Sequence, residues 1–207
     1  MAVISNYTNL LTTIGDYLAR SDLTSFLPNF VQNWEERFYR ESDNWGSWME
    51  AALNVTITNN VAAVPVDYLG LKTSYISGQS SPPLKRISLD QMLQRYPRAV
   101  ASSGPTAYIA RNATNFIFGP VSASGTLAGT YYAKPTVLRS DGDGSNFLIT
   151  DCPDLCLYGS LLEAEVFIKN DKRLPTWSQL YSVALDAYRS RMRSEDYSGS
   201  PPHTVVV

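Results

Sequence analysis

The spacing of apolar residues changes twice along the 207-residue chain. Near both ends, apolar residues recur every three or four positions, as on one face of an amphipathic helix, whereas the middle contains alternating runs typical of strands. Helices that flank an insertion share a core only if they pack against each other. The pattern therefore predicts an α+β fold: a helical bundle formed by N- and C-terminal helices, with a β-rich insertion and an extended C-terminal tail.

Two helices are predicted at each end of the chain. The N-terminal pair covers residues 6–20 and the stretch around Pro28 to Arg40, and a turn at Ser21-Asp22 joins them into an antiparallel hairpin. The C-terminal pair covers about residues 153–169 and 177–193. Each helix carries one apolar stripe, which in the second helix consists of Leu27, Phe30, Val31, Trp34 and Phe38.

The intervening segment is predicted to consist mostly of strands. Alternating or β-rich runs cover residues 53–57, 64–76, 107–118 and 126–138. A short helix over residues 88–94 interrupts them, with Ser88 as its N-cap and Gln91 completing a capping box. These boundaries divide the chain into a helical hairpin (1–47), a β-rich insertion (48–149), C-terminal helices (150–197) and a tail (198–207).

Composition limits the classes of function. A formal net charge of −2 and a pI near 5.4 argue against a protein that binds nucleic acid tightly through electrostatic attraction. No apolar run reaches the ~20 residues of a membrane span, and residues 1–10 lack the layout of a signal peptide. We therefore expect a soluble protein made in a cytoplasm, with no membrane partner. The 13 tyrosines and four tryptophans suit interfaces, although β-rich cores also use them.

The two cysteines are interpreted as buried core thiols. Cys152 and Cys156 do not have the thioredoxin-type spacing, and His203, the only histidine, lies far from them in the sequence, whereas a zinc site needs three or four ligands. The surrounding residues instead favour the start of a helix, with Asp151 or Cys152 as N-cap and Pro153 in the first turn. We expect no metal, no disulfide and no cofactor.

No catalytic constellation is evident in the sequence. There is no glycine-rich phosphate loop and no serine with a plausible histidine base. The neighbouring Glu35 and Glu36 point about 100° apart on a helix, and Glu163 and Asp43 form a glycosidase-type pair only if the fold brings them together. The acidic, glycine-rich stretch at residues 140–145 lacks the ligand pattern of a calcium loop. We therefore expect a protein that is not an enzyme.

Several short motifs, taken in order, give the chain a family resemblance. They are Leu27-Pro-Asn-Phe-Val31 with Trp34 and Glu35, Val64-Pro-Val-Asp-Tyr-Leu69, Phe116-Ile-Phe-Gly-Pro120, Pro153-Asp-Leu155 with Tyr158 and Leu161, and finally Arg173, Trp177 and Tyr181. Their order over residues 6–188 resembles the adaptor, or head-completion, proteins of tailed bacteriophages. One departure is Trp34, which stands where the family commonly has a small residue before the glutamate.

The resemblance implies a structural virion protein, made in the host cytoplasm and located at the head-tail connector. Such proteins assemble as a homo-oligomeric ring, here expected to be a dodecamer, below the portal protein. The ring extends the DNA channel toward a downstream tail or nozzle protein, and genomic DNA passes through it without tight binding. A tail-associated binding module and a virion glycan hydrolase are the alternatives.

The C-terminal tail is the predicted portal-binding segment. Two prolines favour an extended conformation, and the β-branched residues that follow suit strand addition to a partner. Proteins of the resembled family reach the portal with C-terminal extensions. The residues expected to bind the portal are Pro201, Pro202, His203, Thr204, Val205, Val206 and Val207.

Overall fold

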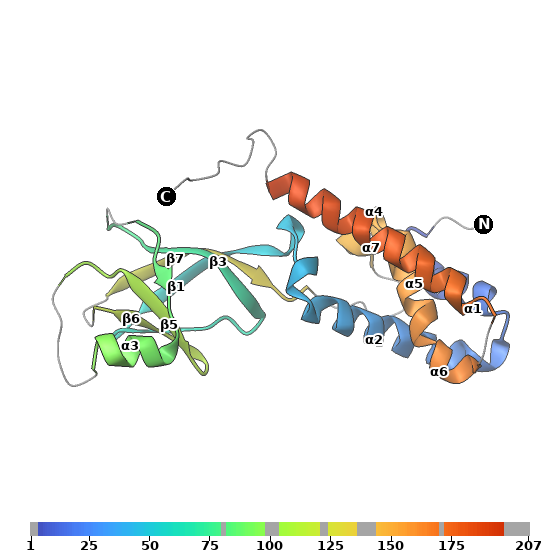
Figure 1. Cartoon of the computed structure of the whole chain (residues 1–207), viewed down its shortest axis with the longest axis horizontal. Helices are drawn as coiled ribbons and strands as arrows, with labels where there is room; N and C mark the ends of the chain where they lie inside the picture. Colours follow the sequence, from blue (N-terminus) through green and yellow to red (C-terminus); the bar gives the residue numbers. More distant parts are fainter. Residues whose placement is uncertain are drawn as a thin grey trace. The chain divides into compact units, whose positions relative to one another are not determined.

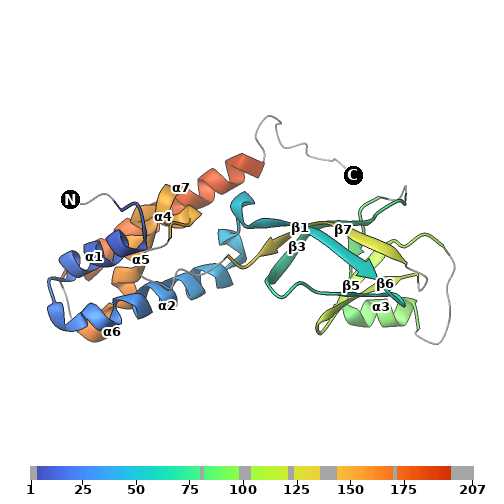
Figure 2. The same ribbon diagram turned by 180° about the vertical axis from the view of Figure 1, so that it is seen from behind.

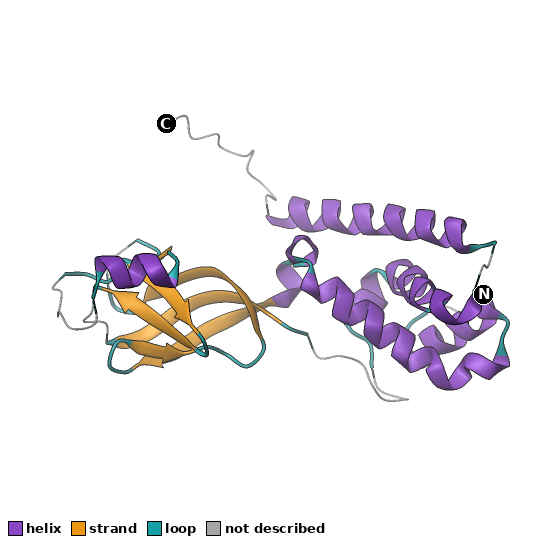
Figure 3. Cartoon of the chain, turned by 60° about the horizontal axis from the view of Figure 1, so that its bottom comes forward, coloured by secondary structure: helices purple, strands orange, loops and turns teal. Residues whose placement is uncertain are grey.

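The computed structural model describes residues 4–79, 82–97, 104–120, 124–135, 144–169 and 172–196 (Figure 1). The chain divides into two compact units, which we call the helical unit (Met1–Trp48 and Thr136–Val207) and the β unit (Met49–Pro135). Figure 3 distinguishes their helices from their strands. The structure is mixed α+β with helices at both ends, which confirms the predicted fold class. The predicted tail lies outside the described residues.

The helical unit combines elements from both ends of the chain. Its N-terminal part contains α1 (Tyr7–Leu18), a 3-10 segment (Ser21–Phe26) and α2 (Leu27–Arg40), followed by 3-10 turns at Ser42–Asn44 and Ser47–Met49. Its C-terminal part contains α4 (Phe147–Asp151), α5 (Pro153–Glu163), α6 (Glu165–Ile168) and α7 (Leu174–Asp196). α5 contacts α1, α2 and α7, so it is the central helix of the unit (Figure 2).

Local sequence explains where several helices begin. The side chain of Asn6 caps α1 by accepting the N–H of Asn9 (2.8 Å), and Pro28 lies in the first turn of α2. Asn146 caps α4 in the same way by accepting the N–H of Ile149 (2.9 Å). The apolar spacing did not predict α4, whose five residues are too few to show a helical period. The predicted helix over residues 153–169 is interrupted by a turn at Ala164, which separates α5 from α6.

Trp34 of α2 packs closely against Gly159 of α5. Trp34 is fully buried, and a methyl group built on Gly159 would overlap its indole ring. The indole N–H donates to the hydroxyl of Tyr181 in α7 (3.4 Å). One large side chain therefore touches three helices, and the absence of a side chain at residue 159 makes room for it.

A second long-range connection centres on Asn44, which is buried in the turn after α2. Its amide N–H donates to the carbonyl of Phe38 (2.9 Å), and its amide oxygen accepts from Arg189 of α7 (2.8 Å). Its backbone carbonyl accepts the hydroxyl of Tyr188 (2.6 Å), and that hydroxyl oxygen accepts the indole N–H of Trp48 (2.9 Å). These bonds satisfy buried polar groups and fix α7 to the end of the N-terminal helices.

The β unit contains two sheets. In the first, β1 (Glu50–Ile57), β7 (Gly125–Ala133) and β3 (Tyr68–Ile76) pair antiparallel in the order β1-β7-β3. In the second, the order is β2 (Val61–Ala63), β6 (Asn115–Gly119), β5 (Tyr108–Asn112) and β4 (Lys85–Arg86). The pairing of β4 with β5 is parallel, whereas the others are antiparallel.

The buried faces of both sheets contribute to one apolar core. Its members include Leu53, Ile57, Leu71, Ile76, Leu84, Ile109, Phe116, Phe118 and Leu127. The alternation predicted for residues 53–57 is confirmed, since Leu53 and Ile57 are buried while Asn54 and Thr56 are exposed. Gly129 of β7 has a φ of 151°, and a side chain there would collide with the backbone of Thr73.

The helix α3 (Leu89–Arg95) belongs to the β unit and has the predicted capping box. The Ser88 hydroxyl accepts the N–H of Gln91 (3.2 Å), and the Ser88 N–H donates to the side-chain oxygen of Gln91 (3.3 Å). Met92 is buried, and the backbone of Gly119 lies close to both Met92 and Tyr96. This packing attaches α3 to the end of β6.

Both cysteines are buried and neither forms a disulfide, as predicted. Pro153 is in the first turn of α5, and Cys152 precedes it at the N-cap position without a side-chain capping bond. Burial raises the pKa of the Cys152 thiol to about 11 and the pKa of Cys156 well above its ordinary value. Both side chains are therefore neutral thiols near pH 7.

Replacing Gly159 by alanine is expected to lower the free energy of unfolding by about 1–3 kcal/mol, because the added methyl group overlaps the Trp34 ring. Gly15→Ala is a matched control, since its methyl group would meet Leu27 at an ordinary 3.5 Å. That change removes a glycine from a helix and should stabilise by about 0.5–1 kcal/mol. Urea unfolding followed by circular dichroism measures both. Undiminished stability of Gly159→Ala would contradict the close α2–α5 packing.

The two thiols are expected to resist alkylation in the folded protein. At pH 8, iodoacetamide should modify Cys152 and Cys156 at least about a hundredfold more slowly in buffer than in denaturant, because thiolate is scarce at the raised pKa values. Mass spectrometry at timed intervals measures the rates. Fast modification of either cysteine under native conditions would show that its thiol is accessible and ionised.

Candidate functional site

The two pairs of carboxylates considered for catalysis, Glu163 with Asp43 and Glu35 with Glu36, all lie in the helical unit. Glu163 is near the end of α5, and its Oε1 forms an ion pair with Nη1 of Arg37 (2.8 Å). Asp43 is exposed in the 3-10 turn after α2. Glu35 is buried and accepts from the amide of Asn146 (3.4 Å), whereas its neighbour Glu36 is half-exposed. Their different burial agrees with the expectation that Glu35 and Glu36 do not converge.

The described residues contain no group of three or more histidine, cysteine, aspartate or glutamate side chains placed to hold a metal ion. The acidic stretch at residues 140–145 falls mostly outside the described part of the chain. Between α2 and α5, burial and the nearby Glu35 raise the pKa of the Tyr39 hydroxyl. This tyrosine is therefore a neutral, buried residue near pH 7.

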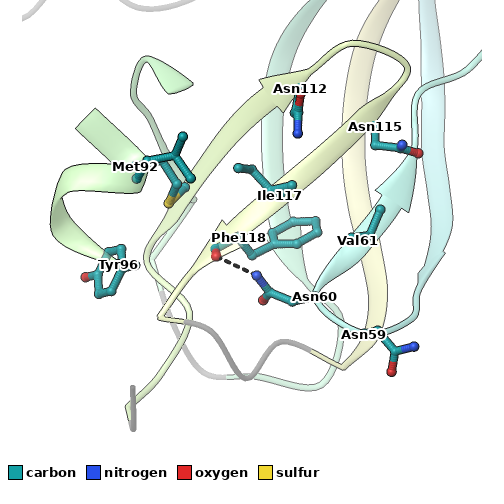
Figure 4. A pocket seen from close by; sticks show the side chains of 10 residues that line it. Asn59, Asn60, Val61, Met92, Tyr96, Asn112, Asn115, Ile117 and Phe118 are labelled. Carbon is teal, nitrogen blue, oxygen red and sulfur yellow. Dashed lines mark hydrogen bonds between the residues drawn. The ribbon is translucent and has the colours of Figure 1, made fainter. Parts of the chain in front are cut away.

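A hollow of about 350 Å³ lies in the β unit, between α3 and the hairpins that contain β2 and β6 (Figure 4). Its lining carries no charged side chain: Asn59, Asn60, Val61, Met92, Leu93, Tyr96, Asn112, Asn115, Ile117 and Phe118. The amide of Asn60 donates to the carbonyl of Phe118 (2.8 Å), as Figure 4 shows. The lining therefore offers amide, phenol and apolar groups, without a carboxylate, an imidazole or a cation.

Turn geometry accounts for two of the asparagines in this hollow. Asn59 and Asn60 have φ values of 52° and 64°, and they form the two-residue turn between Thr58 and Val61. Successive residues with positive φ are characteristic of a tight hairpin turn, for which asparagine is well suited. Asn112 and Asn115 pair across the next hairpin turn, in which Ala113 also has a positive φ.

Four cations of the β unit line two hollows that share Arg86, and together we call them the basic patch: Lys85, Arg86, Arg95 and Arg111. They come from β4, α3 and β5, and all four are exposed. The first three border a hollow of about 550 Å³ together with Gln91, Gln94 and Tyr108. The guanidinium of Arg95 lies 5.1 Å from the centre of the Tyr108 ring. Sequence reasoning missed this patch, because the four residues spread over 27 positions.

Exposed apolar side chains lie on the helical unit. The inner face of α7 is buried through Trp177, Tyr188 and Met192, whereas Leu180 and Val183 face outward, with Val183 62% exposed. The rings of Phe26 and Phe167 contact each other in a tilted arrangement at a centroid distance of 5.1 Å, and both are exposed. Exposed apolar groups of this size are common in protein–protein contacts.

The predicted portal-binding residues, 201–207, lie outside the described residues, which end at Asp196 in α7. Among the helices that the structure describes, none is both long and apolar enough to cross a membrane. The features that the described residues bring together are the basic patch, the uncharged hollow and the exposed apolar residues of the helical unit.

Comparison with known proteins points to the same kind of molecule. A search of curated proteins found no match. The model of one family, described as the SU10 adaptor protein, matches residues 5–205, which include both units and most of the predicted tail. This match agrees with the resemblance to phage adaptor proteins. The chain therefore belongs to the SU10 adaptor protein family and is a structural adaptor protein of a bacteriophage.

Proposed function

We propose that the protein is a head-to-tail connector in the virion. Twelve copies form a ring that attaches to the portal protein, extends the DNA channel and joins the head to a downstream tail or nozzle protein. The observation that carries this proposal is the family match over nearly the whole chain, residues 5–205. A ring requires head-to-tail contacts between different surfaces of neighbouring copies. The exposed apolar groups of α7 and the Phe26–Phe167 pair supply candidate surfaces.

The C-terminal tail supplies the portal contact in this proposal. Pro201 and Pro202 favour an extended conformation, which lowers the entropy lost on docking. The residues after His203 are all β-branched and suit addition to a strand or groove of the portal. Burial of the three terminal valines contributes roughly 1.5–3 kcal/mol each before ordering costs.

Genomic DNA passes through the ring without tight binding in this proposal. The net charge of −2 supports weak contact, because each phosphate neutralised by a cation strengthens salt-dependent binding. A glycan hydrolase is less well supported, since Glu163 is engaged with Arg37 and Asp43 is a turn residue. A tail-associated binding module would use similar surfaces, but nothing observed favours it over a connector.

Electron microscopy provides the direct test of the connector. Purified protein mixed with the portal protein of the same phage is expected to give closed rings, stacked coaxially on the portal, whose class averages show twelvefold symmetry. A heterologous contact closes into a ring when the rotation that relates neighbouring copies is a whole fraction of a full turn. Mixtures in which the portal remains bare, or carries isolated copies, would contradict a connector ring.

Deletion of residues 198–207 tests the role of the tail. The shortened chain should unfold at an unchanged temperature, because the cut lies beyond α7, yet its affinity for the portal should fall by more than about tenfold. Replacing Val205, Val206 and Val207 by serine keeps the length and should give a similar loss. Calorimetric titration against purified portal measures both. Equal affinity of all three proteins would remove the tail from the portal contact.

A further inference from the structure

The two units carry opposite net charges. The β unit, residues 49–135, contains seven lysine and arginine residues and three acidic ones, a net charge of +4. The helical unit contains ten basic and sixteen acidic residues, a net charge of −6. The overall value of −2 therefore conceals a strong asymmetry within one chain.

The β unit does not neutralise its own basic patch. Of its three acidic residues, Glu50 forms an ion pair with Lys72 (2.6 Å), and Asp67 accepts the hydroxyl of Tyr131 (3.0 Å). The third, Asp90, is in the first turn of α3, where a negative charge complements the helix dipole. Among the described residues, no acidic side chain forms an ion pair with the four patch cations, and all four are exposed.

The helical unit has the opposite surplus. Four of its arginines already have acidic partners within the unit: Arg20, Arg37, Arg189 and Arg191. Within its described part, five further acidic side chains are exposed and have no ion-pair partner: Asp16, Asp43, Asp154, Glu165 and Asp186. These five carboxylates can therefore form ion pairs with a basic surface of another molecule.

We propose that the basic patch of the β unit binds the acidic helical unit of a second copy of the chain. A symmetric contact between two basic patches would bring eight cations together, so like charges exclude it. A contact in which the patch of each copy meets the helical unit of the next copy is heterologous, which is the kind that closes a ring. The proposal rests on the proposed connector ring and assigns one of its two contact surfaces. Charge complementarity supplies orientation and a fast association rate.

Duplex DNA is the other polyanion that would fit four exposed cations. The observations favour a second copy, because the same chain presents the complementary charge in excess and its net negative charge repels nucleic acid. Arg95 and Arg111 also lie over the rings of Tyr108 and Tyr68 (5.1 and 5.2 Å), which holds two of the four charges in fixed positions. Fixed charges suit a protein contact of defined geometry.

Self-association of the full-length chain, measured by sedimentation velocity, tests the proposal. The association constant of the wild type should fall steadily as NaCl is raised from about 50 to about 500 mM. The double variant Lys85→Gln/Arg86→Gln should associate at least about tenfold more weakly at low salt and lose most of the salt dependence. Arg95→Gln, on α3, provides a second variant that leaves β4 intact.

The matched control changes the charge of the β unit by the same amount elsewhere. Asn54→Asp/Thr56→Glu adds two negative charges on the exposed side of β1, and its association should stay within about threefold of the wild type. Equal weakening by the control would mean that only net charge matters and would overturn the assigned patch. Association that is insensitive to salt and to the patch variants would also overturn the assigned patch. The proposed connector ring would not be affected by that result.

Two further outcomes separate the proposal from its competitors. A wild-type chain that stays monomeric at every salt concentration overturns the contact, whereas the connector itself fails only if no ring forms on the portal. Labelled duplex DNA of about 20 base pairs is titrated in the same buffers. Tight binding of this DNA that the patch variants abolish, together with unchanged self-association, would reassign the patch to nucleic acid.

Discussion

The structure depends on the packing of the Trp34 indole against Gly159, which joins helices from opposite ends of the chain. Trp34 is fully buried and also donates to Tyr181, so α2, α5 and α7 meet at one side chain. Asn44 adds a second connection, because its hydrogen bonds reach Tyr188 and Arg189 of α7. An insertion between residues 49 and 135 is tolerated because these contacts complete the helical core independently of the β unit.

A further aromatic contact lies where the chain leaves the helical unit. Trp48, the last residue before the β unit, stacks on Phe147 at a centroid distance of 5.0 Å. Phe147 begins α4, which precedes the central helix α5. The aromatic residues that composition associated with interfaces are thus used in part inside the protein. Tyr39, Trp34 and Tyr188 are buried, whereas Tyr75 is 46% exposed.

Side chains that could in principle be reactive are buried or ion-paired in this protein. Both thiols are buried and held as neutral groups, Glu35 lies in the core, and Glu163 is ion-paired with Arg37. Charge instead gathers on surfaces, with opposite sign on the two units. This distribution is the basis of the head-to-tail contact that we propose between copies of the chain.

Features with a short range along the chain were predictable from the sequence alone. The 3.6- and 2-residue periods gave the fold class, Ser88 and Gln91 gave the capping box of α3, and Pro153 gave the start of α5. These features depend on neighbours within one or two turns, so the local sequence contains the information they need. The ordered motifs along the chain also indicated the adaptor family, which the match over residues 5–205 confirms.

Only the tertiary structure decided which distant residues meet. Trp34 and Gly159 are 125 positions apart, and no local pattern links them. The basic patch likewise forms because parallel pairing of β4 with β5, and the packing of α3 against β5, place Lys85, Arg86, Arg95 and Arg111 around two hollows that share Arg86. The sequence determined the elements and the net charge. The long-range packing of those elements determined where the charges and the close helix contact lie, because side-chain proximity depends on the whole fold.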